Sequence, residues 1–192
     1  MKIVTLILAG GKSSRMQKDK ALLHINGKPL LTNIYNIAQQ CTEQVYIITP
    51  WAEKYSSILP KHCHFIQESS TFQGGLIAFS EALNYLNSDW ILLLACDLPF
   101  LKVNEVKNWI NALSNIPENS IAFLPKNEKG WECLCGFYHR NCQTSLQQSI
   151  QKGNKSFQQW LHQEIVEELV VKNKQILFNC NTIQDYEKVI NI

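Results

Sequence analysis

Two glycines and a group of cationic side chains lie close together near the start of the chain. Gly10 and Gly11 follow the apolar run Ile3–Leu8, which predicts a buried strand. The cations that come next are Lys12, Arg15, Lys18 and Lys20. Glycine lets a ligand approach the main chain, and exposed backbone N–H groups in such a loop bind phosphate oxygens. A Gly-Gly pair alone indicates a turn, but with these cations it predicts an anion site, best suited to a nucleotide triphosphate.

Two common nucleotide-binding motifs do not fit this stretch. The tripeptide G-K-S, which begins at Gly11, resembles the end of a P-loop, but that motif requires a glycine five positions earlier, where Leu6 stands. The dinucleotide fingerprint G-x-G-x-x-G is also absent from the stretch. The predicted anion site is therefore of another kind.

A second candidate is an aspartate that follows the most apolar stretch of the chain. Residues 89–95 show no polar alternation, which predicts a strand covered on both faces at the centre of a parallel sheet. Asp97 comes directly after this strand, before a turn that contains Pro99. An aspartate there is either a turn or helix N-cap residue or a ligand for Mg²⁺. That ion usually binds one or two carboxylates together with waters and substrate phosphate oxygens.

Apolar periodicity predicts elements along the whole chain, with no internal repeat and no linker. We expect one domain over residues 1–192. The predicted strands are 3–8, 45–49, 64–67, 89–95, 121–124, 131–138, 164–171 and 175–178. The predicted helices are 28–41, 51–59, 76–86, 102–113, 140–151 and 183–190. Residues 126–138 predict an antiparallel hairpin. Thr182 is expected to cap the last helix, with Asp185 completing a capping box.

Composition limits the classes of partner and the cellular compartment. The chain has 192 residues, of which 45% are hydrophobic, as in a globular protein. The net charge of +2 is too small to indicate a nucleic-acid partner. No apolar run reaches membrane-spanning length, and the first residues show no signal-peptide pattern. We therefore expect a cytoplasmic protein that binds neither nucleic acid nor membrane.

Seven cysteines in a chain with no export signal predict reduced thiols. Cys133, Cys135, His139 and Cys142 are close in sequence, but their spacing matches no standard zinc pattern. Alternation along residues 131–138 would place Cys133 and Cys135 on one face of a strand, as small apolar residues. This interpretation is favoured over a structural metal site.

The string L-A-G-G-K-S-S-R-M-Q-K-D-K, from Leu8 to Lys20, resembles the signature of the MobA family of nucleotidyltransferases. The tetrapeptide D-L-P-F, which begins at Asp97, resembles the metal-binding motif of the same family. The resemblance covers residues 3 to about 188. One position departs from the pattern, because Gln17 stands where the family usually has glycine. The resemblance implies a Rossmann-like three-layer α/β/α fold with a mostly parallel sheet.

The resemblance also implies the residues that bind the nucleotide. The main chain of the first loop would meet it, Arg15 would contact phosphates and Lys20 would be an active-site cation. Asp97 would bind Mg²⁺, and Glu68 is the best match to a carboxylate that contacts the base. The family has Asp at that position, and the following Gly74-Gly75 loop matches poorly. The nucleotide-binding residues implied in this way are Leu8, Ala9, Gly10, Gly11, Lys20, Glu68 and Asp97, with Arg15, Lys20 and Asp97 as the catalytic set.

Elements near the carboxyl end resemble the family's acceptor side. Lys152 and Lys155 are candidates to meet the acceptor phosphate, although a solvated helix entry explains them as well. Asn179 and Asn181 match two asparagines of the family pattern and are expected to reach the site.

The reaction implied by the resemblance is transfer of GMP from GTP to Mo-molybdopterin, with Mg²⁺ as cofactor and pyrophosphate as the second product. Proteins that insert molybdenum or mature molybdoenzymes would be partners. Two alternatives stay open. One is a related cytidylyltransferase that acts on molybdopterin or on a sugar or polyol phosphate, and the other is an inactive nucleotide-binding homologue.

Overall fold

A seven-stranded sheet runs through the centre of the molecule. The structure, a computed structural model, describes residues 1–11, 19–69 and 74–191. The strand order is β11-β7-β10-β6-β1-β4-β5, and β10 is antiparallel to both of its neighbours while the other pairs are parallel. The strands are β1 (Ile3–Leu8), β4 (Val45–Thr49), β5 (His64–Gln67), β6 (Trp90–Ala95), β7 (Ala122–Leu124), β10 (Cys135–His139) and β11 (Val166–Glu168).

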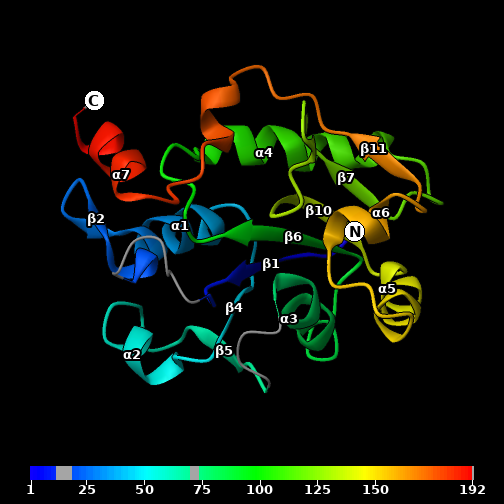
Figure 1. The fold of residues 1–192 in the computed structure, drawn as a ribbon, viewed down its shortest axis with the longest axis horizontal. Coiled ribbons are helices and arrows are strands. Elements are labelled where there is room, and N and C mark those ends of the chain that lie inside the picture. Colours follow the sequence, from blue (N-terminus) through cyan, green and yellow to red (C-terminus); the bar gives the residue numbers. More distant parts are fainter. Residues whose placement is uncertain (12–18, 70–73, 192) are drawn as a thin grey trace.

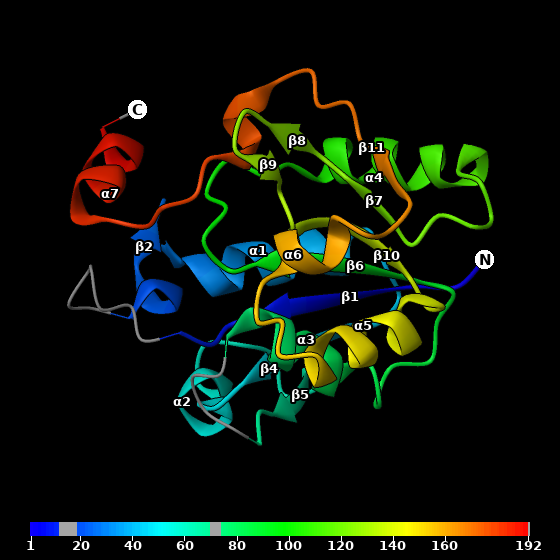
Figure 2. The same cartoon turned by 45° about the vertical axis from the view of Figure 1, so that its right-hand side comes forward.

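Helices cover both faces of this sheet, as Figures 1 and 2 show. One face packs against α1 (Leu30–Gln39) and α4 (Val103–Ala112), with the side chain of Tyr55 from α2 (Ala52–Ser56) in the same core. The other face packs against α3 (Gly75–Ala82), α5 (Cys142–Gln151) and α6 (Phe157–Leu161). The predicted three-layer α/β/α fold with a mostly parallel sheet is therefore confirmed.

The two central parallel strands are apolar because no solvent reaches either side. All six residues of β6 are buried, and so are Val4 to Leu8 of β1. Alternate residues along each strand belong to the two separate cores on the two faces. The bounds predicted for β1, β4 and β5 are confirmed to the residue, and β6 begins one residue later than expected.

Three predicted strands differ from the structure. The strand expected over 131–138 is broken by a turn, so β9 (Gly130–Trp131) pairs with β8 (Lys126–Asn127) and β10 starts only at Cys135. The strand expected over 164–171 is reduced to β11. The strand expected over 175–178 is wrong: Lys174–Leu177 forms a 3-10 helix, because the side chain of Asn173 accepts the N–H of Gln175 and caps a helical turn.

The predicted helices are confirmed in place but are mostly shorter. The helix expected over 51–59 is limited to Ala52–Ser56, and Pro29 immediately precedes α1 instead of lying in its first turn. A further 3-10 helix, Leu113–Asn115, extends α4. Among the described residues, no helix has both the length and the apolar character needed to cross a membrane.

The last helix, α7 (Ile183–Ile190), lies beside residues 24–25 (Figure 1). Its capping box is present as predicted, since Thr182 accepts the N–H of Asp185 and Asp185 accepts the N–H of Thr182. Tyr186 donates to the carbonyl of His24 in β2 (His24–Ile25), which pairs with β3 (Lys28–Pro29), at 2.8 Å. The chain therefore returns to its first third after completing the sheet.

Candidate active site

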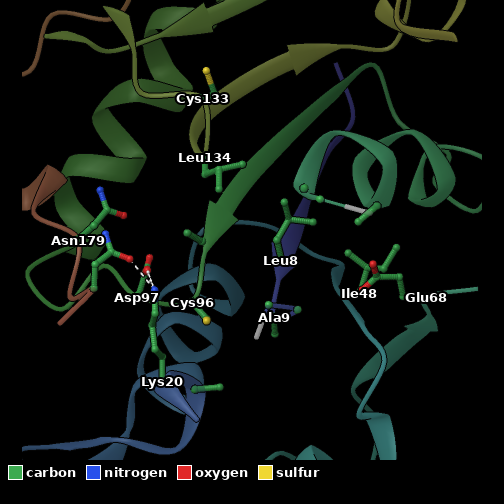
Figure 3. A pocket seen from close by; sticks show the side chains of 18 of the residues that line it. Leu8, Ala9, Lys20, Ile48, Glu68, Cys96, Asp97, Cys133, Leu134 and Asn179 are labelled. Atoms are coloured by element: carbon green, nitrogen blue, oxygen red, sulfur yellow. Dashed lines mark hydrogen bonds and ion pairs between the residues drawn. The ribbon is translucent and has the colours of Figure 1, made fainter. Parts of the chain in front are cut away.

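A cavity of about 740 Å³ opens at the carboxyl ends of the parallel strands. Ligands of open α/β sheets bind at this edge, because loops from several strands meet there. The first glycine loop, the ends of β4, β5 and β6, and the segment around Asn179 all contribute to its lining. Figure 3 shows its residues on three separate walls, with Lys20 and Asp97 on one, Glu68 on another, and Cys133 and Leu134 on a third.

An ion pair forms the first wall, which we call the phosphate wall (Lys20, Asp97 and Asn181). Lys20 Nζ lies 3.3 Å from Asp97 Oδ2, and the two side chains are 21% and 12% exposed. The same ammonium group donates to Asn181 Oδ1. Because both charges are shielded from solvent, their interaction is stronger than that of a surface pair. The arrangement holds a cation and a carboxylate side by side at the edge of the cavity (Figure 3).

The carboxyl group of Asp97 is only partly satisfied. Burial raises its pKa, while the charge of Lys20 and the hydrogen bond from Lys20 lower it. Within the described part of the chain, Oδ1 is buried and accepts no hydrogen bond. A buried carboxylate oxygen without a partner is costly unless a ligand satisfies it. A hard cation such as Mg²⁺ suits this oxygen, since it prefers carboxylate and phosphate oxygens.

The rest of the metal's ligands would have to come from elsewhere. The described residues contain no group of three or more His, Cys, Asp or Glu side chains able to hold a metal ion. This agrees with a cation that is held by one carboxylate together with waters and phosphate oxygens, and not with a closed protein site.

Asp19 positions Lys20 from the preceding residue. It caps the 3-10 helix Lys20–Leu22 by accepting the N–H of Ala21 at 3.1 Å. The buried Tyr55 donates its hydroxyl to the Asp19 carboxylate at 3.0 Å, and Lys54 pairs with the same carboxylate at 2.6 Å. The chain just before Lys20 is therefore anchored to α2.

The segment before α7 supports the same wall from the carboxyl end of the chain. The N–H of Cys180 donates to the carbonyl of Asp97 at 2.9 Å. The N–H of Asn181 donates to Asp185 Oδ2 at 3.1 Å, so the capping box also fixes the residue that binds Lys20. Asn179 and Asn181 both line the cavity, as the sequence predicted.

Glu68 and Gly10 form a second wall, which we call the base wall. Glu68 follows β5 and is buried, and burial raises its pKa, with repulsion from Glu81 raising it further. A Cβ atom at Gly10 would lie 2.8 Å from Glu68 Oε2 and 3.3 Å from Pro50 Cδ. Glycine is therefore required here for the carboxylate to rest against the main chain of the loop.

Most residues expected at the site do line the cavity. These are Leu8, Ala9, Gly10, Gly11, Lys20, Glu68, Asp97, Asn179 and Asn181. Arg15, Lys12, Lys18 and Gln17 lie outside the described residues. Lys152 and Lys155 are exposed and are not among the lining residues, so their role with the acceptor stays a prediction.

Several lining residues were not expected from the sequence. They include Asp19, Trp51, Tyr55, Trp131, Glu132 and Gln158. Asp19 could have been found as the acid before Lys20 that begins a short helix. The others depend on contacts between residues far apart in the chain, for which the sequence carries no local signal.

The cysteine cluster does not form a metal site. Cys133 lies in the turn before β10 instead of on a strand face with Cys135, and its carbonyl accepts the hydroxyl of Tyr138 at 2.8 Å. Cys135 and Cys142 belong to the cores on opposite faces of the sheet. All seven cysteines are free thiols.

Comparison with known proteins agrees with this geometry. A profile described as "MobA-like NTP transferase domain" matches residues 5–168. A protein of Trichormus variabilis named "Probable molybdenum cofactor guanylyltransferase" is 49% identical over 183 residues, which cover 95% of this chain and 88% of that relative.

Solved structures share the fold at lower identity. The "Molybdopterin-guanine dinucleotide biosynthesis protein A" of Archaeoglobus fulgidus superposes with a TM-score of 0.81 at 21% identity, covering 100% of this chain and 97% of that one. A Mycobacterium tuberculosis protein solved in complex with manganese superposes with a TM-score of 0.72 at 16% identity, covering 100% and 99% of the two chains.

Proposed function

We propose that this chain, which belongs to the MobA-like NTP transferase family, transfers GMP from GTP to the phosphate of Mo-molybdopterin and releases pyrophosphate. The observation that carries the proposal is the partly buried Lys20–Asp97 pair at the edge of a cavity large enough for a nucleotide. The curated relative at 49% identity supports the choice of guanine and of the acceptor.

The reaction requires stabilisation of negative charge on the phosphates more than it requires a general base. The phosphate monoester of the acceptor is already an anionic nucleophile at neutral pH, and no histidine is found among the described residues that line the cavity. The barrier comes from repulsion between two anions and from charge that builds up on the α-phosphate and on the leaving pyrophosphate. Cations fixed in a shielded site stabilise such charge without reorganising.

Lys20 supplies one such cation. Asn181 and Asp97 hold its ammonium group at the cavity edge, so the group does not have to be ordered when the nucleotide arrives. Arg15, on the basis of the family pattern, would add a second cation at the phosphates.

Asp97 would hold a divalent cation through its unsatisfied Oδ1. We propose Mg²⁺ in this role, and the manganese complex of the Mycobacterium tuberculosis protein supports a divalent cation on this fold. When bound, the ion would neutralise phosphate charge and lower the repulsion between the two substrates.

Glu68 is the proposed base contact. Its buried carboxylate can accept hydrogen bonds from the adjacent N–H donors on one edge of guanine, whereas adenine and cytosine lack that pair of donors. Burial and the charge of Glu81 raise its pKa, so added hydrogen-bond donors would favour the charged form, and guanine would provide them.

We further propose that residues 1–192 act as one nucleotidyltransferase domain in the cytoplasm. The return of α7 to the β2–β3 hairpin and the seven free thiols support this. Proteins that deliver molybdopterin or receive the dinucleotide stay a prediction.

The direct test is to incubate the protein with GTP, Mg²⁺ and Mo-molybdopterin and to measure pyrophosphate and the dinucleotide by mass spectrometry. We expect both products in equal amounts. Pyrophosphate release without the dinucleotide would indicate a different acceptor, and release only with CTP would favour the cytidylyltransferase. No product with any of the four triphosphates would favour the inactive homologue.

A further inference from the structure

A further carboxylate, that of Glu132, lines the cavity on its third wall. Glu132 follows the β8–β9 hairpin and lines the cavity together with Trp131, Cys133 and Gln158. It is half-buried, and burial raises its pKa, while the Asn127 amide lowers it. Asn127 donates to Oε1, and no described residue donates a hydrogen bond to Oε2. Oε2 is therefore available to a ligand, and Oε1 keeps one of its two lone pairs for a second donor.

The main chain that carries Glu132 is fixed on both sides. Its own N–H donates to the carbonyl of Pro125 at 2.8 Å. The side-chain amide of Gln158, in α6, bonds both backbone groups of Trp131: Oε1 accepts the N–H at 3.2 Å and Nε2 donates to the carbonyl at 2.6 Å. The same Nε2 lies 3.4 Å from the sulfur of Cys133. Gln158 therefore ties the hairpin to the helical layer.

Gly130 makes this attachment possible. Its φ of +121° is strained for other residues, and a Cβ atom there would lie 2.6 Å from Gln158 Oε1. Any side chain at this position would push the amide of Gln158 away from Trp131. Gly130 and Gln158 together therefore fix the positions of Trp131 and Glu132 at the cavity wall.

The position of this wall suits the second substrate. Figure 3 shows Cys133 and Leu134, which follow Glu132 in the chain, apart from both Glu68 and the Lys20–Asp97 pair. If guanine occupies the base wall and phosphates meet the phosphate wall, the third wall is left for the acceptor. The acceptor's phosphate can then reach the α-phosphate between the walls.

The two substrates present the same pair of hydrogen-bond donors, so a carboxylate can bind the base of one and the pterin of the other. Guanine and a pterin carry the same 2-amino-4-oxopyrimidine edge, with a ring N–H beside an amino group. A carboxylate accepts a hydrogen bond from each of these donors, and such charge-assisted bonds are among the stronger ones in proteins. The indole of Trp131, next to Glu132, also lines the cavity. Lys126 Nζ lies over one face of this ring at 5.0 Å from its centroid, which leaves the other face for the planar pyrimidine ring of a pterin.

We propose that Glu132 accepts the ring N–H and 2-amino group of the acceptor's pterin, with Trp131 beside it as a stacking surface. The inference rests on the proposed function, since it names the acceptor subsite of that same cavity. In this arrangement Glu68 and Glu132 select the same hydrogen-bonding edge on two different molecules.

The test compares Glu132→Gln with Glu128→Gln, which lies on the same hairpin but is exposed. Glutamine keeps the shape of the side chain but has only one acceptor oxygen and presents an amino group to the pterin donors. We expect Glu132→Gln to raise the acceptor's KM at least about tenfold while the KM for GTP stays within about twofold. Glu128→Gln should change neither. Thermal unfolding of each variant checks that the fold is intact.

A binding measurement separates this proposal from the proposed function. Equilibrium dialysis gives the Kd of Mo-molybdopterin for the wild type and for Glu132→Gln without turnover, and we expect the same weakening as in KM. Glu68→Gln should leave this Kd unchanged and raise the KM for GTP.

If the wild type transfers GMP but Glu132→Gln binds the acceptor normally, the assignment of Glu132 is wrong. If the wild type binds the acceptor without transferring GMP, the proposed function fails and the Kd comparison still decides the role of Glu132. If the wild type binds no acceptor, both fail.

Discussion

The phosphate wall and the base wall each present a buried carboxylate at the end of a parallel strand, but the two are stabilised in opposite ways. Asp97 has the ammonium group of Lys20 at 3.3 Å, which offsets part of the cost of burial. Among the described residues no cation pairs with Glu68, and its pKa is raised by burial and then by Glu81. On our proposal, the first carboxylate binds a cation and the second accepts hydrogen bonds from neutral N–H donors. Two carboxyl groups at the same edge of a sheet thus differ in their surroundings and in the ligand that each would suit.

Asp97→Ala should give the largest effect, because it removes the acid from the phosphate wall and leaves the base wall intact. We expect turnover to fall by at least roughly 10²–10³-fold, since the divalent cation that Asp97 would hold no longer stabilises the charge on the phosphates. Some nucleotide binding should remain through the loop. Steady-state rates and GTP affinity measured together check this. Retained turnover would contradict the metal role, and complete loss of binding by a folded variant would make Asp97 a binding residue instead.

Lys20→Met removes the cation of the phosphate wall and leaves Asp97 in place. Turnover should fall by about 10²-fold, and its pH profile should move. Lys20 lowers the pKa of Asp97, so without it that pKa rises further and the carboxylate is protonated at a higher pH. Since the ionised form is needed for the cation, the acidic limb of the profile should shift to higher pH. The surface variant Lys61→Met should have the same acidic limb as the wild type. An unshifted acidic limb in Lys20→Met would show that Lys20 does not influence the ionisation of Asp97.

Gly10→Ala tests the base wall alone. The new methyl group would lie 2.8 Å from Glu68 Oε2, so the carboxylate has to move, although the end of a flexible side chain can do so at small cost. We expect the KM for GTP to rise by about tenfold and stability to fall by at most about 1 kcal/mol. Adding Glu68→Asp shortens the acid and should recover part of the affinity. A normal KM for GTP in Gly10→Ala would show that the position of Glu68 does not matter.

Thr182→Ala should have the smallest effect, because it acts on the phosphate wall only through the cap of α7. Loss of an N-cap hydroxyl costs about 1 kcal/mol, which urea denaturation can measure against the exposed control Thr144→Ala. Turnover should fall by no more than about threefold, because Asp185 still accepts the N–H of Asn181. A loss of turnover well above threefold, with the expected small loss of stability, would show that the cap of α7 is needed to place Lys20.

The parts that the sequence predicts well are those fixed by local pattern. The bounds of β1, β4 and β5 follow from short β-branched runs with clear ends, and Asp97 follows from its place after the most apolar strand. The stretch Lys174–Leu177 was predicted wrongly, because a short apolar run does not distinguish a strand from a helical turn that the side chain of Asn173 caps.

The parts that the sequence does not predict depend on contacts across the fold. Gln158 bonds Trp131 from 27 residues away, and Tyr55 bonds Asp19 from 36 residues away. Nothing in the local sequence marks either pair, because its two members are far apart in the chain. Their contacts form only when α6 lies against the β8–β9 hairpin and α2 lies against Asp19.

The central claim is that the base wall selects guanine while the phosphate wall holds the triphosphate and its metal. The most direct test is thermal unfolding with GTP, CTP, ATP and UTP, each with and without Mg²⁺. A ligand that binds only the native state raises the unfolding midpoint according to its affinity. We predict the largest rise with GTP and Mg²⁺, and loss of the preference for GTP in Glu68→Gln. An equal or larger rise with CTP, or no rise with any triphosphate, would contradict the account.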